Sequence, residues 1–197
     1  MIERYNLFLH EFSQEEPKEL QLFSIIAQSF FQPFSLMDNL LVIMTALTAG
    51  PGLGFNRVML FLTDGASLKG EFWLGPASAE EAESIWRVLS TPGIGYPEII
   101  EHNRSLLTSE TDTLTKRLKK LRYPLYKEQS LIPALTASAR QMILVRDAPN
   151  EPTVDRRFVE TIGTDEFLCI PLVSQKDVLG EIILDNAITK LPIRGRD

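Results

Sequence analysis

The sequence predicts an α/β (α+β) domain with an antiparallel sheet of at least five strands, preceded by a short N-terminal extension. Three observations support this fold class. The 197 residues correspond to about one domain of ordinary size. Two pairs of strand-like runs are joined by turns too short for a parallel crossover, which excludes a doubly wound parallel sheet. Runs with helical periodicity lie between the strands.

The composition is that of an ordinary globular protein with an acidic balance. Hydrophobic residues make up 44% and charged residues 23% of the chain, and the net charge is −6. An acidic chain is not expected to use a nucleic-acid-binding surface as its main function. The single cysteine excludes an internal disulfide and fits a reducing compartment. Because the apolar runs are too short to span a membrane and the N-terminus lacks a secretory pattern, we expect a cytoplasmic protein.

Two amphipathic helices are predicted before the first strand. The first lies between Pro17 and Pro33, because proline suits the first turn of a helix and ends a helix that precedes it. Its apolar stripe, at helical spacing, consists of Leu20, Phe23, Ala27 and Phe30. Ser35 can cap a second helix, which ends at the breaker residues 49–52.

The middle of the chain predicts a hairpin, a helix and a loop. The hairpin joins the strand-like runs Arg57–Thr63 and Leu68–Leu74 through an Asp-Gly turn. The spacing of a capping box then starts a helix over residues 79–89. Residues 91–111 are rich in Pro, Gly, Ser and Thr and have no clear period, so we expect a loop, with or without a short helix at residues 97–102.

The second half of the chain begins with a basic helix over residues 112–122. Its five cations, which suit a solvated face or an anionic partner, are Lys116, Arg117, Lys119, Lys120 and Arg122. A strand over residues 139–146 and a short helix over residues 155–162 are predicted next. The second hairpin pairs residues 167–174 with residues 178–186.

The sequence contains no recognisable catalytic or metal-binding motif. The glycines of residues 50–54 follow a helix and open a strand, which is the reverse of a dinucleotide-binding loop. His10 and His102 have no further Cys or His at metal-ligand spacing, although His102 alone could ligate a haem iron. Cys169 lies in an apolar run, as a small buried hydrophobe or as a thiol that lines an interior cavity. We therefore predict no catalytic residue and no metal site, and the cofactor stays unknown.

Several short strings resemble a GAF domain. Residues 36–64 are similar to the opening of that family, with a helix, a glycine-containing bend and a strand that ends in Asp, and residues 169–183 resemble its closing hairpin. More specific strings are Gly52-Leu53-Gly54-Phe55-Asn56-Arg57, Leu68-Lys69-Gly70, Gly75-Pro76 and Asp185-Asn186. Together they resemble the GAF domains that serve as input modules of bacterial sensor histidine kinases. The resemblance covers about residues 20–193.

The resemblance implies a GAF-type central antiparallel sheet of five or six strands with helices on both faces. It divides the chain into an extension with a dimerisation helix, residues 1–35, and a sensory domain, residues 36–193. It also implies that a small molecule of unknown identity binds in a cavity beside the sheet. The signal would pass to a downstream histidine kinase transmitter of a two-component system. Strand positions in that part of the fold give four candidate ligand-binding residues, Phe61, Trp73, Arg140 and Cys169.

The resemblance implies an input module rather than an enzyme. The Cys-His pair of bilin-binding members, the several cysteines of the methionine sulfoxide reductases and the motifs of a kinase are missing. The alternative is a dimerisation and relay module whose cavity is filled by its own side chains. The first helix is apolar on more than one side, which predicts a homodimer built on it. Its interface residues would be Leu20, Phe23, Ala27 and Phe30.

Overall fold

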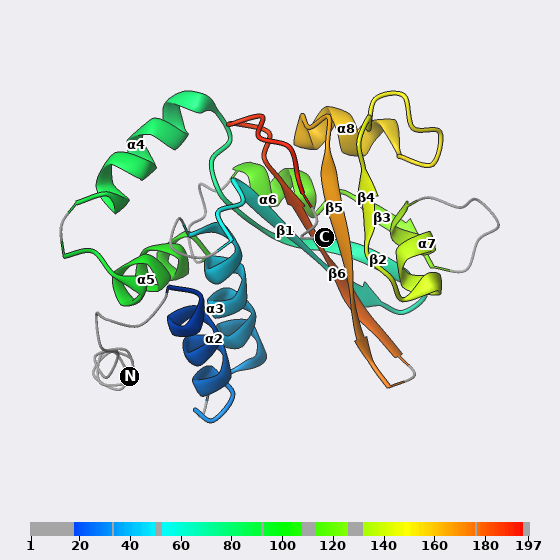
Figure 1. The fold of residues 1–197 in the computed structure, drawn as a ribbon. Helices are drawn as coiled ribbons and strands as arrows, with labels where there is room; N and C mark the ends of the chain where they lie inside the picture. Colours follow the sequence, from blue (N-terminus) through cyan, green and yellow to red (C-terminus); the bar gives the residue numbers. More distant parts are fainter. Residues whose placement is uncertain are drawn as a thin grey trace. The chain divides into compact units, whose positions relative to one another are not determined.

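The computed structural model describes residues 18–32, 34–49, 53–91, 93–107, 113–125, 132–175 and 177–194. They belong to two compact units (Figure 1). The first unit combines Met1–Phe55 with Ser78–Glu110, and the second combines Asn56–Ala77 with Thr111–Asp197. Within the described ranges, no helix has both the length and the apolar character that a membrane crossing requires.

The described part of the first unit consists of helices. They are α2 (Lys18–Ser29), α3 (Leu36–Thr48), α4 (Ala79–Leu89) and α5 (Tyr96–Leu107). The first three confirm the predicted helices. α3 begins at Ser35, whose hydroxyl accepts the Asp38 N–H, while the Asp38 carboxylate accepts the Ser35 N–H. This reciprocal capping satisfies two backbone donors that the helix itself leaves unpaired.

The helix allowed for at residues 97–102 is present but longer than expected, because α5 occupies Tyr96–Leu107, and the loop expected over the rest of residues 91–111 is correspondingly shorter. Ile100 is buried, and Asn103 Nδ2 donates a hydrogen bond to Thr45 Oγ1 of α3 at 3.0 Å. The partner of this helix therefore lies far away in the sequence. Contacts between residues distant in sequence can stabilise a helix whose own apolar periodicity is weak. Such a helix cannot be predicted from sequence periodicity alone.

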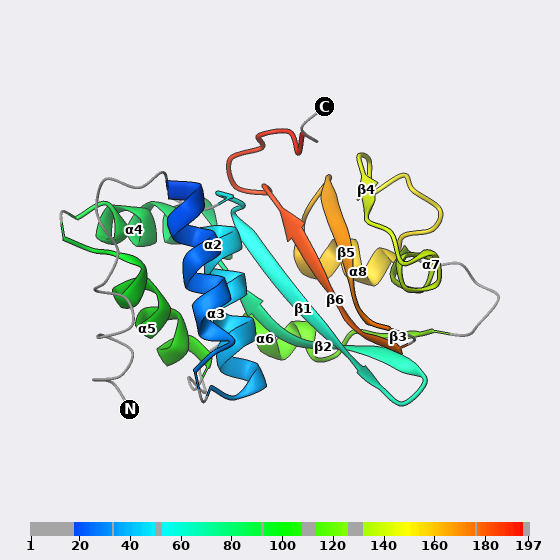
Figure 2. The same ribbon diagram turned by 60° about the horizontal axis from the view of Figure 1, so that its bottom comes forward.

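The second unit is built on a six-stranded antiparallel sheet with the order β3-β2-β1-β6-β5-β4. Both predicted hairpins are confirmed. β1 (Arg57–Asp64) pairs with β2 (Ser67–Leu74), and β5 (Phe167–Ser174) pairs with β6 (Asp177–Asp185). β1 also pairs with β6, which joins the two hairpins into one sheet (Figure 2). The edge strands β3 (Arg122–Pro124) and β4 (Ile143–Val145) are short.

Three helices of the second unit contribute to one core with the sheet. They are α6 (Thr113–Leu118), α7 (Ile132–Ala139) and α8 (Arg156–Ile162). Leu118, Ala137 and Phe158, one from each helix, belong to the same buried cluster as Met59 and Phe61 of β1. Figure 2 shows the three helices on the same side of the sheet. We call the sheet face that bears Met59 and Phe61 the inner face.

The predicted strand over residues 139–146 is too long. Helix α7 ends at Ala139, and Arg140 then adopts a positive φ of 52° in the following turn. The strand itself covers only Ile143–Val145. β4 is an edge strand, so β5 is its only partner in the sheet. Only Ile143–Val145 pair with β5, and the strand is therefore limited to these residues.

The predicted basic helix is also shorter than expected, since α6 ends at Leu118 and Arg122 already pairs with Lys69 in the sheet. Gly70 explains the close approach of α6 to β2. A Cβ atom on Gly70 would lie 2.2 Å from the carbonyl oxygen of Leu118. The main-chain N–H of Gly70 in turn donates to Leu121 O at 3.1 Å, which draws the chain after α6 onto the sheet.

Candidate functional site: the inner face of the sheet

The structure brings three of the four predicted ligand-binding residues together. Phe61, Trp73 and Cys169 are buried in one cluster on the inner face. Arg140 does not join them. It is exposed, and its guanidinium donates to the carbonyl oxygen of Gln175 at 2.6 Å. The prediction placed Arg140 in a strand, but it lies in the turn after α7, and the strand-based reason for including it is therefore wrong.

Glu181 is a buried carboxyl that is not among the residues predicted from the sequence. It belongs to β6 opposite Phe61 of β1, and its exposed fraction is 0%. The thiol of Cys169 donates to Glu181 Oε2 at 3.1 Å, whereas Glu181 Oε1 has no hydrogen-bond partner. Burial raises the pKa of Glu181 to about 8, although the Cys169 thiol and the backbone of Ala137 oppose the change. Glu181 is therefore mainly a neutral carboxylic acid near pH 7.

Cys169 is a protonated thiol in this environment. Its side chain is fully buried, and burial together with the neighbouring Glu181 raises the pKa of the thiol well above its usual value. The nucleophile in cysteine chemistry is the thiolate, which needs a lowered pKa and access to the reactant. The geometry therefore favours the interpretation of Cys169 as a small buried side chain and a hydrogen-bond donor.

Tyr123 lies over the same face from the edge strand β3. Its ring centroid is 5.8 Å from that of Phe61, its exposed fraction is 2%, and its hydroxyl has no hydrogen-bond partner. Burial and the nearby Asp155 carboxylate raise the pKa of the Tyr123 hydroxyl, which stays protonated. The sequence pattern does not indicate Tyr123, because a three-residue edge strand gives almost no periodic signal.

A small apolar cavity lies beside Tyr123. Its volume is about 10 Å³, which is roughly the room that one water molecule requires. The residues that line it are Tyr123, Ile132, Pro133, Val154, Asp155, Phe158, Phe167 and Ile183. Phe158 and Phe167 pack ring to ring at 5.1 Å and form one wall. The polar side chains of this lining are Tyr123 and Asp155.

The only cation buried among the described residues, Arg57, is already neutralised. Its Nε and Nη2 atoms donate to the two carboxylate oxygens of Asp185 at 2.8 and 2.6 Å. The guanidinium also lies 5.0 Å from the ring centroid of Trp73, whose Nε1 has no hydrogen-bond partner. A two-pronged, buried ion pair of this kind satisfies both charges internally. Arg57 therefore offers no free positive charge to an anionic ligand.

Asparagines hold the segment that follows β6. Asn56 Oδ1 accepts hydrogen bonds from the N–H groups of Ile188 and Thr189 and from the Thr189 hydroxyl. Asn186 Oδ1 accepts the Asn56 N–H at 3.2 Å, and its Nδ2 donates to Leu191 O at 3.1 Å. These bonds fix the course of the chain after the last strand, which is the structural role expected of asparagine at such positions.

A shallow surface cavity of about 180 Å³ lies beside this segment. Its carboxylates are engaged, since Asp165 pairs with Lys190 at 3.1 Å and Glu166 pairs with Arg146. Glu166 Oε2 also accepts the N–H of Ile193. Neither here nor elsewhere in the described ranges is a group of three or more His, Cys, Asp or Glu side chains arranged to hold a metal ion.

The sequence matches no family model and no curated protein, but solved structures resemble the chain. The GAF domain of a phosphoenolpyruvate-protein phosphotransferase (ptsP) from Coxiella burnetii matches with a TM-score of 0.52 and 19% identity, over 87% of this chain and 79% of that chain. Residues 122 to 287 of a methyl-accepting chemotaxis protein match with a TM-score of 0.54 and 14% identity, over 86% and 83%. The chain has the GAF fold. The expected sheet of five or six antiparallel strands is therefore confirmed, with six strands.

The GAF fold also occurs in an enzyme among these neighbours. The free methionine-R-sulfoxide reductase from Neisseria meningitidis, solved in complex with its substrate, matches with a TM-score of 0.50 and 12% identity, over 92% of this chain and 83% of that chain. One fold therefore supports different functions, and the function of this chain must be argued from its own side chains.

Proposed function

We propose that the chain is a cytoplasmic sensory or regulatory module that binds a small molecule at the inner face of its sheet. The observation that supports this function best is a group of buried polar atoms without hydrogen-bond partners, Trp73 Nε1, Tyr123 Oη and Glu181 Oε1. Leaving such an atom unpaired costs about 1–3 kcal/mol, and few buried groups in folded proteins are left so. A ligand with matching groups would recover part of that free energy.

The GAF fold supports the same proposal at the level of architecture. The candidate ligand contacts are Phe61, Trp73 and Cys169, which belong to the same buried cluster as Tyr123, although other residues of that cluster line the small cavity beside Tyr123. We extend the proposal to the organisation of the chain, with residues 1–35 as an extension and residues 36–193 as the sensory domain. In this proposal the signal passes to a downstream histidine kinase transmitter.

Native mass spectrometry of the purified chain tests the proposal, because a bound small molecule adds a discrete mass. We expect Phe158→Trp, which enlarges a side chain in the cavity wall, to remove the added mass. Val173→Trp is the matched control, since Val173 lies 42% exposed on β5. A chain that carries no added mass, and whose melting temperature does not respond to a broad panel of metabolites, would contradict ligand binding.

The second candidate is a dimerisation and relay module without a ligand of its own. The small size of the cavity beside Tyr123 favours it, because about 10 Å³ admits no more than about one water molecule. The same experiment separates the two functions. A relay module would carry no added mass, and both tryptophan variants would give the mass spectrum of the unaltered fold.

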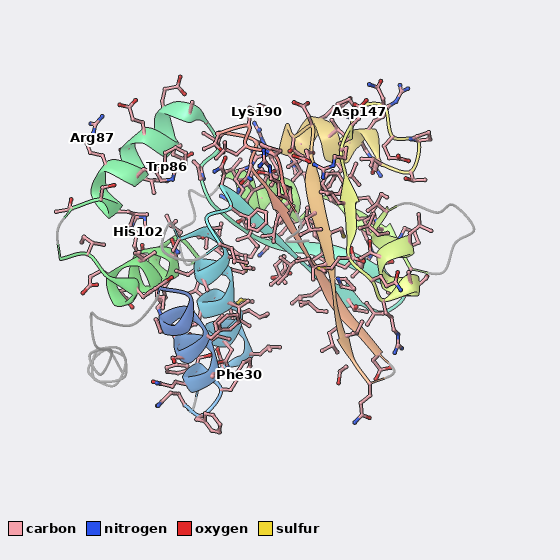
Figure 3. All side chains as sticks on the ribbon, viewed as in Figure 1. Phe30, Trp86, Arg87, His102, Asp147 and Lys190 are labelled. Carbon is pink, nitrogen blue, oxygen red and sulfur yellow. The ribbon has the colours of Figure 1, made fainter. Side chains whose placement is uncertain are left out.

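A homodimer built on α2 is part of both candidates. Ile25 and Ser29 are buried, whereas Ala27 is exposed and Phe23 and Phe30 are 67% and 60% exposed. Phe30 projects outward just after the end of α2 (Figure 3). The side chain of Leu20, the fourth predicted interface residue, lies outside the described part of the structure. Large exposed apolar side chains on one helix face favour pairing with a second copy, because a two-fold axis makes the face self-complementary.

Sedimentation velocity tests the dimer. We expect the double variant Phe23→Glu, Phe30→Glu to be monomeric, because charges on the proposed interface would be buried without partners. Val88→Glu in α4 is the matched control, since Val88 is 59% exposed and lies outside the proposed interface. A dimer that survives the double variant, or a monomeric parent at about 10 µM, where a dimer with a Kd near 1 µM would be largely formed, would contradict the proposal.

A further inference from the structure

The charges around the inner-face cavity are already compensated, which restricts the chemistry of a ligand. Arg57 is the only cation buried among the described residues, and both its Nε and its Nη2 atoms donate hydrogen bonds to the Asp185 carboxylate. Asp155, at the cavity wall, accepts the N–H of Arg157 at the start of α8 and pairs with its guanidinium at 3.3 Å. A charged ligand would therefore enter without a counter-charge, and burying an unpaired charge is strongly unfavourable.

The polar groups that do lack partners are uncharged. Tyr123 keeps its phenolic proton, and Glu181 is mainly a neutral acid near pH 7. A neutral carboxyl group offers a donor beside an acceptor, and a phenol can do either. Both side chains are at least nine-tenths buried, and α7 packs against the strands that carry them, β3 and β6. Glu181 is not itself in the cavity lining but lies two residues before Ile183, which is, on the same face of β6. Apart from Tyr123 and Asp155 the lining is apolar, with Phe158 and Phe167 forming one wall.

We propose that the ligand of this site is a small uncharged molecule with a flat apolar body and a hydrogen-bonding edge, held at that edge by Tyr123 and Glu181. The inference rests on the proposed sensory function. An aromatic ring is larger than the cavity of about 10 Å³. The ring can therefore enter only if some of the residues that line the cavity move apart. Helix α7 has no charged residue in Ile132–Ala139, so moving it breaks no ion pair of its own, but it does break the contact of the Ala137 backbone with Glu181.

Three probes of the same shape and different charge test the inference on the whole purified chain. Benzamide is neutral, benzoate is an anion and benzamidinium is a cation, and each joins a phenyl ring to a planar three-atom head. We expect saturable benzamide binding at about millimolar concentration near pH 7, measured by ligand-observed NMR, because a fragment of this size has limited affinity. The two charged probes should bind at least about tenfold more weakly, as an uncompensated buried charge requires.

Two variants place the binding at Glu181 and Tyr123. In the parent chain, benzamide binding should weaken about tenfold between pH 7 and pH 9, as Glu181 with a pKa of about 8 loses its proton. Glu181→Gln should bind benzamide without this pH dependence. Glu160→Gln, in an exposed part of α8, should keep it. Tyr123→Phe should bind more weakly at both pH values, because it removes one hydrogen-bonding group.

Equal or tighter binding of benzoate or benzamidinium would overturn the inference, and so would benzamide binding that is the same at both pH values in the parent chain. Absence of saturable benzamide binding would overturn it as well. Circular dichroism of each variant at each pH verifies that the fold is intact. A retained ligand that proves to be charged would support the sensory function while refuting this assignment, so the two proposals fail separately.

Discussion

Replacing Glu181 with glutamine should remove a large pH dependence from the stability of the protein. The pKa of Glu181 rises from 4.5 to about 8 because burial disfavours the charged form. A raised pKa in the folded state means that the stability contribution is fully present below pH 4.5 and is lost as the pH rises to about 8. At about 1.4 kcal/mol for each tenfold change in proton affinity, the full loss is about 5 kcal/mol, and about 3 kcal/mol of it has occurred by pH 7.

Urea denaturation between about pH 4.5 and pH 9 measures this effect, with the free energy of unfolding determined at each pH. The glutamine amide is neutral at every pH, and its oxygen can still accept the Cys169 thiol. Relative to the parent chain, Glu181→Gln should therefore gain about 3 kcal/mol in stability from pH 4.5 to pH 7 and about 4 kcal/mol from pH 4.5 to pH 9. Glu160→Gln, which alters an exposed carboxyl, is the control and should show no comparable gain. Parallel pH profiles for the parent and Glu181→Gln would refute the reasoning.

Three further substitutions test contacts of the second unit. Asn186→Ala removes the hydrogen bonds to the Asn56 N–H and to Leu191 O and should lower the free energy of unfolding by about 1–2 kcal/mol in a thermal scan. Asp185→Asn leaves Arg57 buried without a counter-charge and should lower the free energy of unfolding by about 3–5 kcal/mol in urea denaturation. The double variant Asp185→Leu, Arg57→Met should restore most of that free energy. Gly70→Ala places a Cβ atom 2.2 Å from Leu118 O and should displace α6, visible as faster amide exchange in that helix. An unchanged exchange rate in α6 would show that the close approach is not needed.

The sequence predicted well where a local signal has one structural meaning. The hairpin from residue 57 to residue 74 and the one from residue 167 to residue 185 were found from alternation and short turns, since a turn of two or three residues allows only antiparallel pairing. Ser35 and Ser78 marked helix starts for a similarly local reason, because an N-cap side chain bonds a backbone N–H within three residues.

The candidate site was predicted less completely. Phe61, Trp73 and Cys169 were found from their strands, but Glu181 and Tyr123 were not. A single Glu in the apolar run of β6 is a detectable signal, because a charged residue within a buried strand is unusual. Its meaning still depends on which face of the strand it occupies. Arg140 was placed wrongly for a related reason, since local sequence did not distinguish the end of α7 from the start of β4.

By itself, the sequence determined the strand pairs joined by short turns and the helix starts with capping side chains, because each depends on residues close together in the chain. The single cysteine likewise excludes a disulfide within these 197 residues. Only the tertiary structure decided the pairing of Arg57 with Asp185, the unpartnered Oε1 of Glu181 and the length of α5. Burial and hydrogen bonding at those positions depend on residues that lie far away in sequence. The chemistry of the inner face follows from that burial, since the same carboxyl group would be ionised on the surface and is mainly neutral in the core.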